Sequence, residues 1–155
     1  MKKIVLLLAA VFAVTLLKAQ SDKEEIDLMQ ATFGMQKKEM MKEFVKLNDS
    51  QKDAFWKLYD EYETARKELG KQRIDLLKDY AKNFDKMTNE SADVWTAKVI
   101  DLSKKTDDLI VTYYNKIKKV TSPLVALQFY QVEGYILSGI RLSILEQLPL
   151  PEIKE

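Results

Sequence analysis

Clusters of carboxylates are the side chains best suited to chemistry in this sequence. Asp60, Glu61 and Glu63 lie within four residues of one another, and Asp107 and Asp108 are adjacent. Paired carboxylates can act as general acid and base, and several convergent oxygens can bind a hard cation such as Ca²⁺. These clusters are interleaved with lysines and lack the spacing of a metal loop. We therefore expect a solvated helix face, with no catalytic residue, no metal site and no cofactor.

Composition narrows the chemistry further. The chain of 155 residues contains no His and no Cys. Imidazole acid and base catalysis, thiol nucleophiles, zinc sites of His and Cys, and disulfides are therefore ruled out. The 25 basic and 24 acidic residues alternate along the chain. A nucleic-acid-binding protein needs a large basic patch, so we expect neither an enzyme nor a nucleic-acid binder.

Two charges lie in the otherwise apolar stretch "YQVEGYILSGIR". Glu133 and Arg141 are eight residues apart, about two helical turns, and could share one face. Gly134 and Gly139 would allow another helix to approach closely. We interpret these four residues as a dimer contact or a contact within a bundle, with a structural ion pair. The alternative is a docking site for a membrane sensor.

Four of the six methionines lie between residues 29 and 41. Flexible thioethers suit promiscuous apolar binding surfaces, but they also fill irregular gaps in a core. We favour core packing and retain client binding as the functional alternative. The candidate client-binding residues are Met29, Phe33, Met35, Met40, Met41 and Phe44.

The first twenty residues have the order of a secretory signal peptide. Two lysines precede an apolar run from Ile4 to Leu17, and the small Ala19 follows. Fourteen apolar residues are too few for a span of about 20. We expect cleavage after Ala19, a periplasmic or secreted protein, and no stable membrane anchor after cleavage. An uncleaved anchor is the alternative. Removal of three leader lysines leaves 22 basic against 24 acidic residues.

The remaining sequence predicts an all-α protein of about four long antiparallel helices. Only four Gly and three Pro are present, which leaves few turn residues for β-structure. We predict helices from about residue 22 to 46 with a kink or break at Gly34, from Asn48 to about Lys86, from Thr88, and after Ser122. Phe55, Tyr59 and Tyr62 recur at helical spacing and are predicted core, with Trp56 at its edge. The predicted divisions are a leader at 1–19, an N-terminal helical segment at 20–46 that could be mobile, a helical core domain at 47–151, and a tail at 152–155.

Two of the predicted helix starts share a motif. Leu47, Asn48 and Gln51 follow a Leu-Thr-x-x-Gln pattern with Asn for Thr, and Met87 and Thr88 begin a weaker copy forty residues later. In this the chain resembles an exported branch of the Spy/CpxP (LTxxQ) family of periplasmic stress chaperones and adaptors. The resemblance implies a hairpin of long curved helices that dimerises into a cradle. It also implies that the motif residues shape this cradle.

The function we expect follows from export and this resemblance. It is an ATP-independent, chaperone-like protein that holds unfolded or misfolded envelope proteins and forms a homodimer. The alternative is an envelope-stress sensor or adaptor that binds and modulates one signalling partner. A chaperone would use non-directional apolar burial, which gives breadth of binding rather than selectivity.

Overall fold

Four α-helices make up most of the part of the chain that the structure describes. The computed structural model describes the backbone of residues 23–152 and the side chains of residues 33–152, and this part contains no strand. The predicted all-α class is confirmed. The predicted leader, the Met29 side chain and residues 153–155 lie outside the described part. The elements are α2 (Lys23–Phe44), α3 (Asp49–Asn83), the 3₁₀ turn η1 (Phe84–Lys86), α4 (Asn89–Val120) and α5 (Pro123–Leu145).

Side-chain caps set the starts of α3, α4 and α5 as the sequence predicts. The Asn48 carboxamide accepts from the Gln51 backbone N–H at 3.1 Å, and the Gln51 side chain accepts from the Asn48 N–H at 3.2 Å. Thr88 and Ser91 form the same reciprocal capping box at the start of α4. At α5 the Ser122 hydroxyl accepts from a backbone N–H. Each cap satisfies donors that a helix terminus leaves unpaired.

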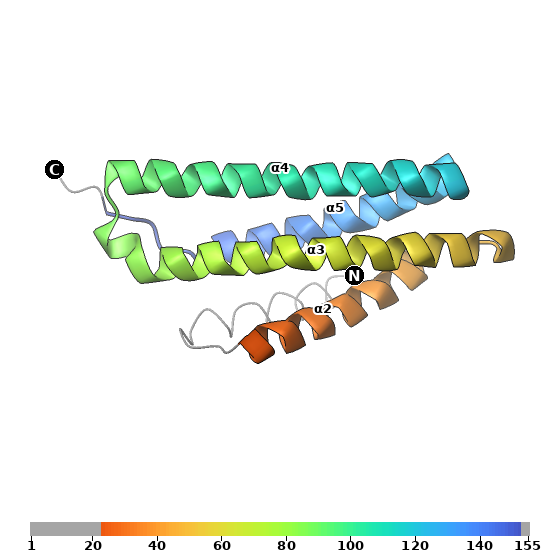
Figure 1. Cartoon of the computed structure of the whole chain (residues 1–155), viewed down its shortest axis with the longest axis horizontal. Coiled ribbons are helices and arrows are strands. Elements are labelled where there is room, and N and C mark those ends of the chain that lie inside the picture. Colours follow the sequence, from red (N-terminus) through yellow and green to blue (C-terminus); the bar gives the residue numbers. More distant parts are fainter. Residues whose placement is uncertain (1–22, 153–155) are drawn as a thin grey trace.

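Helices α3, α4 and α5 lie side by side along the long axis of the molecule (Figure 1). Tight turns at residues 87–88 and 121–122 make successive helices antiparallel. At 35 residues, α3 is about 50 Å long. The shorter α2 packs against both α3 and α5 and closes the fourth side of the bundle over part of its length.

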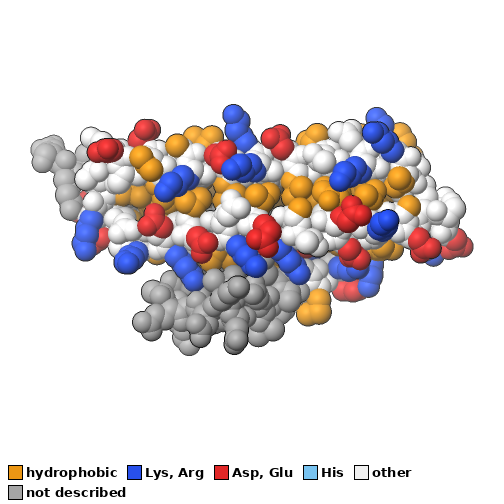
Figure 2. All heavy atoms as spheres, viewed as in Figure 1, with side chains coloured by type: hydrophobic (Ala, Val, Ile, Leu, Met, Phe, Trp, Pro, Cys, Tyr) orange, Lys and Arg blue, Asp and Glu red, His pale blue; other side chains and the backbone are white. Residues whose placement is uncertain are grey.

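The core lies where these four helices face one another. Phe55, Tyr59 and Tyr62 are buried and Trp56 is half-buried, so the predicted core face of α3 and its edge are confirmed. Edge-on ring contacts join Tyr62 to Tyr113 of α4 and to Phe129 of α5. The buried cluster comprises Met41, Val45, Phe55, Tyr59, Tyr62, Ile110, Tyr113, Ile117, Val125, Ala126 and Phe129. A band of apolar side chains follows the seam between α3 and α4, with charged residues on both flanks (Figure 2).

Gly34 does not interrupt α2. The predicted break is wrong, because the helix runs without a gap from Lys23 to Phe44. A kink at Gly34 stays a prediction. A Cβ atom built at Gly34 would lie 3.6 Å from a Glu63 carboxylate oxygen and 3.9 Å from the Lys67 side chain. Those are ordinary van der Waals distances. Gly34 therefore carries the entropic cost of glycine in a helix without any steric need for it.

We predict that Gly34→Ala stabilises the protein by about 0.5 to 1 kcal/mol, because alanine loses less backbone freedom on folding. Urea unfolding followed by circular dichroism measures the change. Gly134→Ala on α5 is the matched control, since nothing lies within 4 Å of its built Cβ, and it should stabilise by a similar amount. A loss of stability in Gly34→Ala alone would mean that α2 packs more tightly on α3 than this geometry allows.

Candidate functional site

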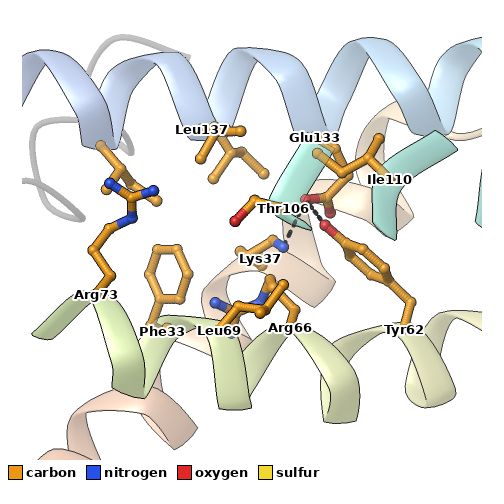
Figure 3. Close-up of a pocket in the computed structure, with 13 residues that line it drawn as sticks. Phe33, Lys37, Tyr62, Arg66, Leu69, Arg73, Thr106, Ile110, Glu133 and Leu137 are labelled. Atoms are coloured by element: carbon orange, nitrogen blue, oxygen red, sulfur yellow. Dashed lines mark hydrogen bonds and ion pairs between the residues drawn. The ribbon is translucent and has the colours of Figure 1, made fainter. Parts of the chain in front are cut away.

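Five polar side chains meet inside the bundle and form what we call the ionic cluster: Lys37, Tyr62, Glu63, Arg66 and Glu133. The Lys37 ammonium lies 2.7 Å from Glu63 Oε1 and 2.8 Å from Glu133 Oε2. The Tyr62 hydroxyl donates to Glu133 Oε2 at 2.7 Å, and Arg66 Nε donates to the Glu63 carboxylate at 3.0 Å. Figure 3 shows Lys37 and Tyr62 converging on the same carboxylate of α5.

The ionic cluster balances its own charge. Lys37 and Arg66 are cations, and Glu63 and Glu133 are carboxylates. Burial disfavours the charged form of Glu63, but the charges and hydrogen bonds of Lys37 and Arg66 outweigh burial and hold its pKa below the ordinary value. Burial and the neighbouring Glu133 carboxylate raise the pKa of Tyr62 well above its ordinary value. The tyrosine therefore stays protonated and remains a hydrogen-bond donor.

A cavity of about 60 Å³ adjoins the ionic cluster. Its walls include Phe33, Leu69, Ile110 and Ile136, in addition to cluster residues. Glu133 Oε1 and Arg66 Nη2 are buried and have no hydrogen-bond partner in the protein. The cavity is thus mainly apolar. Two of its lining residues each have an unpaired polar atom: the acceptor Glu133 Oε1 and the donor Arg66 Nη2. Any small molecule that carries both a donor and an acceptor, water included, suits such a site.

A second cavity, of about 200 Å³, lies further along the bundle between α3, α4 and α5. Arg73 lines both cavities, and it reaches from α3 toward α5 (Figure 3). Arg141 of α5 lines the second cavity and pairs with Asp107 of α4 at 3.1 Å. The Arg73 guanidinium donates to the Ser103 hydroxyl at 3.3 Å. No carboxylate among the described residues forms an ion pair with Arg73.

The outward side of α5 is apolar and exposed. We call Leu124, Leu127, Tyr135, Leu142 and Leu145 the α5 outer face, since their spacing places them within one arc of about 80° at 100° per residue. Their exposed fractions range from 39% to 72%. The residues between them on this arc are the uncharged Gln131 and Ser138. A helix that is apolar on all sides is normally buried, so this exposed face needs an explanation.

The structure separates the six candidate client-binding residues. Phe33, Met40 and Met41 are buried, which agrees with the core packing that we favoured and removes them from the accessible surface. Phe44 is half-buried. Met35 is 64% exposed. A client surface built from the described members of this set would therefore consist mainly of Met35.

The candidate contact residues of α5 also separate. Glu133 forms the expected structural ion pair within the bundle, but with Lys37. Arg141 pairs with α4 instead, so a Glu133–Arg141 pair is ruled out. A Cβ at Gly134 would meet nothing within 4 Å, so Gly134 does not provide a close helix approach. Gly139 is half-buried in the middle of α5.

The motif residues lie at the two helix starts. Leu47 packs against the core cluster, and the Asn48 and Gln51 side chains form the first capping box. Met87 and Thr88 occupy the equivalent turn before α4. Leu47, Asn48, Gln51 and Thr88 therefore have a local structural role. They do not line either of the two cavities.

Lys37 and Glu63 are the cluster members whose burial was not predicted. Glu63 was assigned to a solvated face, but it is 9% exposed because it lies four residues after the buried Tyr59. Lys37 follows Phe33 by four residues and precedes Met41 by four. Each charged residue therefore lies on the apolar face of its helix. This spacing could have predicted that Lys37 and Glu63 are buried. Among the described residues, no group of three or more acidic side chains is arranged to hold a metal ion.

We predict that Tyr62→Phe destabilises the protein by about 1.5 to 3 kcal/mol, because the Glu133 carboxylate loses a buried hydrogen bond. Tyr59→Phe is the matched control. The buried Tyr59 hydroxyl has no partner, so its removal should be neutral or stabilising. Denaturant unfolding of the two variants gives both values. Equal destabilisation would contradict the assignment of the hydrogen bond to Tyr62.

We also predict that the free energy of unfolding falls in acid, partly through Glu63. The folded state holds the pKa of Glu63 below its ordinary value of 4.5. Its contribution is therefore complete above pH 4.5 and is lost as pH falls through the folded-state pKa. Glu63→Gln should be less stable at neutral pH and should show a shallower loss below pH 4.5. Urea unfolding between pH 3 and 7 tests this, and an unchanged slope would contradict the role of Glu63.

Comparison with known proteins finds no match. No family model matches the chain, and neither the curated proteins nor the solved structures include a significantly similar one. The resemblance to the Spy/CpxP family therefore stays a prediction from the two helix-start motifs. A functional proposal must therefore be supported by the ionic cluster, the two cavities or the α5 outer face.

Proposed function

We propose that this protein is an exported, non-enzymatic binding protein that holds apolar segments of unfolded or misfolded envelope proteins in a chaperone-like manner. The observation that carries the proposal is the α5 outer face. Soluble proteins rarely expose contiguous apolar patches, and those that do commonly use them for binding other proteins. The leader-like sequence at 1–19 supports export, which would bring this face into contact with envelope proteins.

The distribution of charge on α5 strengthens this proposal. The helix has two charged residues, Glu133 and Arg141, and both pair with other helices of the bundle. The outer face therefore has no charged side chain to restrict what it contacts. No helix in the described part is long and apolar enough to span a membrane. A partner of mixed sequence with exposed apolar side chains fits this surface, since apolar burial is not directional.

We predict that the chain from Gln20 to Glu155 suppresses aggregation of a chemically denatured model protein, measured by light scattering after dilution. A triple variant, Leu127→Gln, Leu142→Gln and Leu145→Gln, should lose most of this suppression because burial of each leucine supplies about 1.5 to 3 kcal/mol. The matched control replaces three exposed apolar residues of α4 by Gln: Val94, Ile100 and Val111, which are 46% to 55% exposed. The control should retain suppression.

Three outcomes would contradict this proposal. Absence of suppression by the parent chain at several-fold molar excess would rule out general holding and would favour an adaptor with one partner. Equal loss in both triple variants would show that the α5 outer face has no special role. Conversion of a dimer to a monomer by the α5 variant, with suppression unchanged, would identify the face as a homodimer interface instead.

A further inference from the structure

The second cavity combines apolar walls with a positive charge that the protein does not balance by an ion pair. Leu77 of α3, Val99 of α4 and Ile144 of α5 contribute walls, and Arg73 and Arg141 lie among the lining residues. These arginines come from two different helices. The cavity is therefore a product of the folded bundle and not of one local motif.

Arg73 is the unusual member. It is half-buried, and the one hydrogen bond found for it among the described residues goes to the neutral Ser103 hydroxyl. The other two arginines both have carboxylate partners, Glu63 for Arg66 and Asp107 for Arg141. A guanidinium removed from water is normally paired, because its desolvation is costly. Burial and the like charge of Arg141 accordingly lower the pKa of Arg73, and Asp107 only partly offsets them.

We propose that this cavity binds a small amphipathic carboxylate, an unbranched apolar chain with one carboxylate head group. The carboxylate would bind at Arg73, Ser103 and Arg141, and the chain would lie against Leu77, Val99 and Ile144. Arginine presents a planar fork of donors that matches a carboxylate. The bound head group would supply the counter-charge that Arg73 lacks, and the apolar walls would bury the chain.

This site is distinct from the α5 outer face. The cavity lies between α3, α4 and α5, whereas the outer face is mainly exposed to solvent. Leu145 alone belongs to both, at the edge of the cavity. The proposal therefore does not depend on chaperone-like holding, and each can fail without the other.

The test is isothermal titration calorimetry of the chain with decanoate, below its micelle-forming concentration. Decanol, decyltrimethylammonium and acetate are the comparison ligands, which respectively remove the charge, reverse it and remove the chain. We expect saturable one-to-one binding of decanoate and weaker binding of all three others. Arg73→Gln should weaken decanoate binding roughly ten- to hundredfold, as expected for loss of a charge-assisted hydrogen bond, and should leave decanol binding unchanged.

Matched variants separate a local charge effect from a change in net charge or folding. Lys104→Gln removes an exposed positive charge from α4 and should retain the affinity of the parent chain for decanoate. Arg73→Lys keeps the charge without the planar fork and should bind with intermediate affinity. Should Arg73→Gln fail to fold by circular dichroism, Arg141→Gln gives the same readout and should also weaken decanoate binding.

Trp95 provides a second, local measurement. Its indole lines the same cavity and donates to the Leu76 carbonyl at 3.0 Å. In a Trp56→Phe background it is the remaining tryptophan, and saturating decanoate should shift its emission. Decanoate that binds no more tightly than decanol, binding unaffected by Arg73→Gln, or binding without any change at Trp95 would each overturn the proposal.

Discussion

The Lys37 ammonium joins three of the four helices, and the position of α2 depends on it. Its two carboxylate partners come from α3 and α5 and lie within 2.8 Å. Burying these charges is costly, and an apolar replacement of the whole group could be equally stable. Unlike apolar packing, these directional contacts specify one position of α2. They fix how far α2 slides along its neighbours, because a displacement of one turn would leave the buried Glu133 carboxylate without a paired cation and would leave Glu63 with Arg66 alone.

The placement of polar and apolar residues on α5 follows from this arrangement. In an ordinary surface helix the charges face water and the apolar stripe faces the core. On α5 one charge is buried in the ionic cluster, the other bridges to α4, and leucines and tyrosines face outward. The interior of the bundle is thus unusually polar at the ionic cluster, and its exterior is unusually apolar along α5. Both departures lie on the same helix, α5.

The sequence predicted most of the fold but little of the interior chemistry. Asn48, Thr88 and Ser122 could be recognised as caps because capping depends on residues within one helical turn. Phe55 and Tyr59 could be assigned to the core from spacing alone. The spacing of Lys37 and Glu63 gave the buried face of each helix, but the partner that each charge meets there depends on which helices pack together. The two cavities and the isolated position of Arg73 depend on how three or four helices pack together, which no local pattern encodes.

The turns of this protein have a feature that bears on how its sequence can change. Among the described residues, none has a positive φ angle, and all four glycines of the chain fall inside helices. The reversals of chain direction therefore require no left-handed backbone and no particular glycine. They rely on single side-chain oxygens, whose loss costs about 1 kcal/mol each. The residues of the connections can therefore be substituted one at a time. The paired charges inside the bundle, in contrast, must be replaced together.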